Sequence, residues 1–252
     1  MSTAKNIVCN RTALITGASR GIGASVARQL ARAGMDIGIN YRSKGPRAQE
    51  VADEVVASGQ QALLLQADIT NPDEVTAMFT RIEASWKKLD FLILNASGGL
   101  EQGKAADYAM RLNLTAQINV VNSALPLMGV GGRIVFVTSH LAHFYGTGPT
   151  YEGYEAVAIS KRAGEDALRA MMPKLMIRGI RLVVVSGDLI EGTITPKLLE
   201  RQNRGLITKR KQAVGVLPGV EEFATAITLA ATSEAYSHGE TIYIGNTNGE
   251  GL

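Results

Sequence analysis

The chain alternates between short apolar segments typical of buried strands and longer segments with helical spacing. The expected strands cover residues 12–16, 36–40, 61–68, 90–95, 132–139, 181–187 and 241–245. Helical segments lie between them, among them 46–58, 105–128, 151–177 and 219–232. Strands that alternate with helices in this way form parallel sheets. The order therefore predicts one α/β domain over residues 1–252, a doubly wound, seven-stranded parallel sheet with helices on both faces.

Composition supports one globular domain and argues against several partners. An apolar content of 46% in 252 residues suffices for one large core. The formal net charge of +3 is small, and the basic residues are interspersed with acidic ones, so no nucleic-acid surface is indicated. The single cysteine, Cys9, cannot form an internal disulfide. No signal peptide, membrane span or metal site is indicated, and we expect a cytoplasmic protein that acts on a small molecule.

One segment, 188–215, interrupts the alternation. It has weak apolar periodicity and contains the basic run "RQNRGLITKRK". It follows the carboxyl end of a strand, where open α/β sheets bind ligands. We interpret it as a lid over the substrate, and a solvated pair of surface helices is the alternative.

The stretch "TGASRGIG" (16–23) joins the first strand to the first helix. Gly17 allows a sharp turn, Gly21 lets the backbone approach a phosphate, and Gly23 permits close packing of the helix. The helix N-terminus supplies N–H groups and a positive dipole end for a pyrophosphate. This context predicts a Rossmann-type dinucleotide site.

The end of the second strand indicates which dinucleotide binds. An NAD site has an acid here for the ribose 2′-hydroxyl. This chain has "NYRS" (40–43), in which Arg42 suits a 2′-phosphate, and Arg20 could reach it from the glycine loop. The prediction is NADPH. Asp68 is expected to accept from the adenine amino group or to cap a helix.

The chain resembles the short-chain dehydrogenase/reductase family over essentially its whole length. The resemblance rests on "TGASRGIG", "LNASGG" (94–99), "RLNLTAQ" (111–117), "RIVFVTS" (133–139) and Lys161. It implies that Asn113 holds a proton-relay water and that Ser139 polarises the substrate carbonyl. It also implies that Lys161 binds the nicotinamide ribose and lowers the pKa of an acid tyrosine. The motif "SGD" (186–188) replaces the family's usual Pro-Gly.

Motif and resemblance together assign a set of residues to the cofactor. These are Gly17, Ser19, Arg20, Gly21, Ile22, Gly23, Asn40, Tyr41, Arg42, Ser43, Asp68, Ile69, Asn95, Ala96, Ser97, Lys161 and Gly187.

The family's acid tyrosine stands four residues before the lysine, where this chain has Val157. A divergent branch, similar to NADPH-dependent enoyl-thioester reductases, keeps its tyrosine seven residues before the lysine. Tyr154 and Lys161 have that spacing, and on a helix seven residues are about two turns, so both lie on nearly one face. Tyr154 is therefore the predicted proton donor. In the alternative, Tyr151 and Tyr154 are only wall residues and neither is the proton donor.

Two reactions fit these residues. The Asn113, Ser139 and Lys161 set favours reduction of a ketone, and the displaced tyrosine favours reduction of an enoyl thioester. His140, His143 and Phe144 after Ser139 suggest a wide aromatic wall and a bulky, polycyclic ketone. The stretch loosely resembles actinobacterial aromatic polyketide (angucyclinone) ketoreductases.

Ketoreduction in polyketide biosynthesis is therefore the first prediction, and a non-catalytic NADPH-binding protein is a further alternative. The resemblance also implies a homotetramer, paired through the helices at 105–128 and 151–177.

Overall fold

The computed structural model describes residues 11–101, 103–148 and 150–247, and its centre is one parallel sheet. Seven strands pair in the order β3-β2-β1-β4-β5-β6-β7. Their bounds are β1 (Thr12–Ile15), β2 (Asp36–Tyr41), β3 (Ala62–Gln66), β4 (Phe91–Leu94), β5 (Arg133–Ser139), β6 (Arg181–Gly187) and β7 (Thr241–Ile244). The strand order reverses direction between β1 and β4, which creates the crevice where doubly wound sheets bind ligands. The predicted fold class is confirmed.

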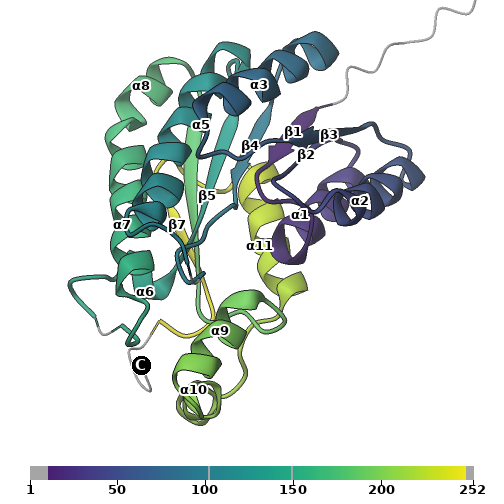
Figure 1. The fold of residues 1–252 in the computed structure, drawn as a ribbon. Helices are drawn as coiled ribbons and strands as arrows, with labels where there is room; N and C mark the ends of the chain where they lie inside the picture. The colour runs from purple at the N-terminus through teal and green to yellow at the C-terminus, as the bar shows by residue number, and fades with distance from the viewer. Residues whose placement is uncertain (1–10, 102, 149, 248–252) are drawn as a thin grey trace, which may run out of the picture.

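Helices cover both faces of the sheet (Figure 1). On one face lie α1 (Gly21–Arg32), α2 (Gly45–Ala57) and α11 (Val220–Thr232). On the other lie α3 (Pro72–Trp86), α5 (Ala116–Ala124), α7 (Glu155–Ala170) and α8 (Met172–Ile177). Successive side chains of a strand enter opposite cores, as with Ala13 and Leu14 of β1. Because both faces are buried, the strands read as continuous apolar runs.

The helix expected over 105–128 is interrupted. It divides into α4 (Tyr108–Met110), a π-helical turn η1 (Arg111–Thr115), α5, and a 3₁₀ turn η2 (Leu125–Leu127) that contains Pro126. The π turn is centred on Asn113, and α7 approaches it closely. A Cβ on Gly164 would lie 2.1 Å from the Asn113 carbonyl oxygen, so this approach requires glycine. Such π turns are frequent at functional sites.

The helix expected over 151–177 begins later than predicted. Gly153 has a φ of +78°, which is not helical, and α7 starts at Glu155. Tyr154 is therefore the N-cap residue, and Tyr151 lies before the helix. The helix then breaks at Met171, and α8 starts anew with Pro173 in its first turn.

Two helices form the segment 188–215 that the sequence set apart. They are α9 (Ile194–Gln202) and α10 (Leu206–Val214), and Gly205 with φ +84° turns the chain between them. A third apolar cluster joins Leu199 and Leu206 of these helices to Tyr151 and Tyr154. The segment is thus packed on the loop that holds Tyr151 and Tyr154 and is more than a solvated surface pair. In the described ranges, no helix combines the length and apolar character that crossing a membrane requires.

Candidate functional site

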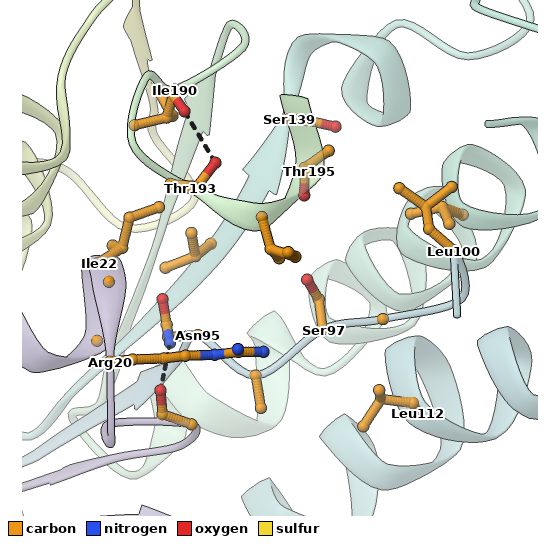
Figure 2. A pocket seen from close by; sticks show the side chains of 18 of the residues that line it. Arg20, Ile22, Asn95, Ser97, Leu100, Leu112, Ser139, Ile190, Thr193 and Thr195 are labelled. Carbon is orange, nitrogen blue, oxygen red and sulfur yellow. Dashed lines mark hydrogen bonds between the residues drawn. The ribbon is translucent and has the colours of Figure 1, made fainter. Parts of the chain in front are cut away.

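A cavity of about 650 Å³ extends from the glycine loop to α9, at the carboxyl ends of the strands. All residues that the sequence assigned to the cofactor line it, as do Ser139 and Tyr154. Figure 2 shows Asn95 and Ser97 on the segment after β4, with Leu100 farther along it. Asn113 does not line the cavity.

The glycine loop has the shape that a pyrophosphate requires. Gly17 and Gly21 have φ values of +68° and +55°, and no atom lies within 4 Å of a Cβ built on Gly21. A Cβ on Gly23 would lie 2.6 Å from the Gly17 carbonyl oxygen, so α1 can enter the loop only with glycine here. The first turn of α1 has no acidic residue, and its N-cap residue Arg20 makes no capping side-chain hydrogen bond. These features fit an anion at the helix N-terminus.

The end of β2 provides a basic surface. Arg42 donates to the Tyr108 hydroxyl at 2.7 Å and lies 3.8 Å from the Asp68 carboxylate. Lys44 and Arg47 also line this end of the cavity, and they follow Arg42 so closely in the sequence that "NYRSKGPR" could have indicated them. A phosphate fits this set of positive charges.

Asn40 and Asp68 have structural partners. Asn40 accepts from the Gly17 amide at 3.2 Å and donates to the carbonyls of Leu65 in β3 and Ala67 just after it, so it anchors the glycine loop. The Asp68 carboxylate accepts from the amide and hydroxyl of Thr70. It therefore caps a turn rather than α3, whose cap is Asn71.

Ser139 and Tyr154 meet at the centre of the cavity. Ser139 ends β5, Tyr154 precedes α7, and their hydroxyl oxygens are 3.0 Å apart. Burial raises the pKa of Tyr154, and the hydrogen bond to Ser139 lowers it in part. The phenol is therefore neutral near pH 7 and can donate a proton.

Lys161 lies on α7 about two turns beyond Tyr154, and its side chain is buried. Burial lowers the pKa of its ammonium group to about 8, and the charge of Glu165 opposes this effect. We expected Lys161 to lower the pKa of the phenol. In this structure, Ser139 is the group that lowers the pKa of Tyr154.

Asn113 is fully occupied by backbone and side-chain partners. Its amide nitrogen donates to the Gly98 carbonyl at 2.8 Å and to the Ser160 hydroxyl at 2.9 Å. Its amide oxygen accepts from the Gly98 amide at 3.3 Å. Asn113 therefore ties the loop after β4 to α7. Its role in holding a relay water stays a prediction.

The place left by the family's usual tyrosine is filled by the loop after β4. Gly99 has a φ of +122°, and a Cβ there would lie 3.0 Å from a Val157 methyl and 2.8 Å from the Ala109 Cβ. This close packing leaves little room for a larger side chain at position 157. Tyr154 is the tyrosine that reaches Ser139.

The expected aromatic wall is wrong. His140, His143 and Phe144 do not line the cavity, because α6 (His140–His143) directs them toward β6, β7 and α7. His140 shares a hydrogen bond with Ser186 at 2.8 Å, and burial lowers its pKa to about 4, so it is neutral. Phe144 stacks on Tyr243.

Aliphatic residues form the substrate end instead. They come from loops, from helical segments and from the lid segment, and they are Leu100, Leu112, Leu141, Val157, Leu189, Ile194 and Leu198. Sequence periodicity could not have selected them, because five of the seven lie on helical segments and the pattern alone does not separate apolar residues that face a cavity from those that face the core.

Comparison with known proteins places this geometry in one family. The family model described as short chain dehydrogenase matches residues 11–203. The chain is 33% identical to 1-cyclohexenylcarbonyl-CoA reductase of Streptomyces collinus over 187 residues, which is 72% of this chain and 65% of that protein. The match covers only 54% to 65% of the full length of the first curated relatives.

Two solved structures share the fold from end to end. A short chain dehydrogenase of Burkholderia cenocepacia in complex with NADP has a TM-score of 0.82 and 28% identity, covering 96% of this chain and 98% of that one. The angucycline C-6 ketoreductase LanV with bound NADP has a TM-score of 0.76 and 26% identity, covering 94% and 95%. Family model and structures lead to the same conclusion, and this chain belongs to the short chain dehydrogenase family.

Proposed function

We propose that the chain is an NADPH-dependent reductase that reduces the carbonyl group of a bulky, apolar ketone. The observation that carries the proposal is the pair formed by Ser139 and Tyr154, whose hydroxyls are 3.0 Å apart inside the cavity. Two hydroxyl donors that converge on one point suit the oxygen of a ketone, where negative charge develops during reduction.

The preference for NADPH rests on charge. Arg20, Arg42, Lys44 and Arg47 line one end of the cavity, and no acid follows β2 to accept from a ribose 2′-hydroxyl. The two solved relatives described above hold NADP, which agrees with this assignment. Bound NADPH supplies the hydride.

The residues of this chain supply the proton and the charge stabilisation. The Ser139 hydroxyl donates to the substrate oxygen and holds it beside Tyr154. As the oxygen gains charge, the phenol of Tyr154 transfers its proton to it. Lys161, a buried cation on α7, the helix that follows Tyr154, stabilises the phenolate that remains. The aliphatic residues of the loop and lid exclude water.

Reduction of an enoyl thioester is the second candidate. The Streptomyces relative is named as a reductase of a cyclohexenylcarbonyl-CoA, and the seven-residue spacing of Tyr154 and Lys161 resembles enoyl reductases. In that reaction Tyr154 would protonate the thioester oxygen of an enolate. Ser139 is not required, and this difference separates the two candidates.

The substrate class rests on the cavity and on the ketoreductase among the solved relatives. Leucines from several loops and helices suit an apolar ring system better than a charged metabolite. LanV is a ketoreductase of an angucycline, and a polycyclic polyketide ketone is the corresponding proposal here.

A screen of NADPH oxidation tests the proposal. Cyclic ketones, quinones and crotonyl thioesters would be compared with the parent enzyme and with Ser139→Ala. We expect ketone turnover that falls at least about 100-fold in Ser139→Ala, the usual worth of one such donor. Thioester turnover that survives Ser139→Ala would establish the second candidate. NADPH binding without turnover of any compound would support the non-catalytic alternative.

A further inference from the structure

The proposed mechanism requires that Lys161 keep its positive charge although its side chain is buried. The Lys161 side chain is 7% exposed, and burial lowers its pKa to about 8. In the described part of the chain, its ammonium group makes no hydrogen bond or ion pair with another residue. A buried cation without a nearby opposite charge would lose its proton.

Glu165 is the acid nearest to Lys161 in sequence on the same helical face. It stands four residues later, and residues with that spacing are neighbours on a helix surface. The Glu165 side chain is 1% exposed, although the next residue, Asp166, is exposed. A carboxylate so deeply buried needs partners.

Two side chains hold Glu165 in its charged form. The Nδ1 of His143 lies 2.9 Å from one carboxylate oxygen, and the Nε of Arg169 donates to the other at 2.9 Å. Burial would raise the pKa of Glu165, but the hydrogen bonds and charges of His143 and Arg169 hold it below its usual value.

His143 and Arg169 are themselves held in place by contacts from other elements. From β7, the Tyr243 hydroxyl meets the Nε2 of His143 at 2.8 Å, and the Thr241 hydroxyl accepts from Arg169 at 2.6 Å. From α7, Arg162 donates to the His143 carbonyl at 2.6 Å. The orientation of Glu165 is thus determined by α6, α7 and β7 together.

We propose that Glu165 is a positioning residue for the reduction, the fixed counter-charge that keeps Lys161 protonated, with His143 and Arg169 as its holders. The consequence for catalysis rests on the proposed function, since only a reductase uses the Lys161 charge on Tyr154. The charged groups around Glu165 are Lys161, Arg162, Asp166 and Arg169 on α7, and His143 on α6, with the phenol of Tyr243 on β7.

The direct test measures the protonation of Lys161 without any turnover. Trace labelling of lysines with isotopic acetic anhydride, read by mass spectrometry between pH 6 and 10, gives the midpoint at which Lys161 loses its proton. The parent should show a midpoint near 8. Glu165→Gln keeps the size of the side chain and removes its charge, so the midpoint should fall by about one pH unit.

The matched control is Asp166→Asn. It removes the same charge one residue later, from a half-exposed side chain that pairs with Arg162. Its midpoint should equal that of the parent. A Glu165→Gln midpoint equal to that of the parent would overturn the proposal. If Glu165→Gln does not fold, Glu165→Met removes the same charge at similar length and is judged by the same midpoint.

A second measurement uses the substrate found in the screen. The alkaline limb of the kcat/KM profile should move to lower pH in Glu165→Gln by the same amount as the labelling midpoint. The rate at pH 6 should stay within about twofold of the parent, because Lys161 is then protonated in both proteins. A loss of rate that is equal at all pH values would indicate a structural role and contradict the proposal. Absence of any turnover would refute the proposed function and leave the labelling result to decide on Glu165.

Discussion

At the scale of single residues, Tyr154 carries the sharpest prediction. Tyr154→Phe keeps the buried ring and removes only the proton that Ser139 faces. Turnover should fall about 10²–10⁴-fold, the usual worth of positioned acid–base catalysis, while NADPH affinity should hardly change. Steady-state kinetics and cofactor titration measure both. Tyr151→Phe is the matched control, since Tyr151 does not line the cavity at Ser139. Full activity of Tyr154→Phe would assign the proton to another group.

Arg42 carries the prediction on cofactor choice. NADPH should bind at least about tenfold more tightly than NADH, because a charge-assisted contact to the 2′-phosphate exists for NADPH alone. Arg42→Ala should remove most of this preference and leave NADH affinity unchanged. Arg32→Ala, which removes an arginine from the far end of α1, is the control. Equal affinities for the two cofactors in the parent would contradict the assignment.

Residues whose roles depend on the local backbone could be predicted from the sequence. Gly17 and Gly21 show the positive φ values that a tight phosphate loop requires, and Arg42 lines the cavity as its place after the second strand indicates. His140 and His143 could not be placed in the same way. Their partners Ser186 and Glu165 lie 46 and 22 residues away, so the direction of each ring is decided by tertiary packing.

At the scale of helices and loops, the loop at Gly99 packs directly against Val157 of α7. Val157→Tyr restores the family's usual spacing, but the new ring would meet the loop at Gly99 and the Ala109 side chain. Overpacking of this kind costs about 1–3 kcal/mol. The variant should melt at a lower temperature and should be no faster than the parent. Val157→Ile, a smaller enlargement, should be milder in both measurements. A gain in rate for Val157→Tyr would show that the loop can move aside.

The start of α7 illustrates why element boundaries are hard to predict. Apolar spacing continues through Tyr151 and Tyr154, and it indicated one helix from 151 onward. Gly153 adopts a left-handed conformation instead, which releases Tyr154 from the helix and lets its hydroxyl reach Ser139. The sequence contains this glycine, but its conformation follows from the packing of the lid cluster onto the two tyrosines.

A buried ion pair fastens the lid segment to the sheet. Arg210 of α10 makes two hydrogen bonds to the Asp188 carboxylate, at 3.1 and 2.9 Å, directly after β6. Asp188→Asn would remove the carboxylate charge from this buried pair and should destabilise the fold by about 3–5 kcal/mol in urea unfolding. The double variant Asp188→Leu with Arg210→Met should recover most of that loss. The exposed pair of Lys211 and Glu191 is the control, because such pairs contribute about 0–1 kcal/mol. A loss in Asp188→Asn no larger than in Glu191→Gln would show that the pair does not hold the lid.

At the scale of the whole molecule, we expect association through the outer face of α4 and α7. Met110 and Ile159 are 37% and 43% exposed, and the small residue Ala163 lies next to them along α7. Such surfaces let helices of two copies approach closely. We expect a homotetramer, as the family resemblance implies, with its mass measured by light scattering at micromolar concentration. Ile159→Lys should reduce that mass. A monomeric parent would contradict the expectation.

The stability of the whole molecule should record the burial of Lys161. Its pKa falls from 10.5 to about 8 in the folded state, so unfolding takes up a proton between these values. The shift corresponds to about 3 kcal/mol that the fold loses at pH 7, where Lys161 is charged in both states. Lys161→Met removes this cost, and Glu165 keeps Arg169 and His143 as partners.

The variant should therefore be inactive and yet more stable than the parent at pH 7, by up to about 3 kcal/mol in urea unfolding. Since the parent gains stability as the pH rises from about 8 toward 10.5, the difference between the two proteins should shrink over that range. Lys174→Met, on the exposed face of α8, should show neither effect. A Lys161→Met protein that is no more stable than the parent at pH 7 would mean that the buried charge costs the fold nothing.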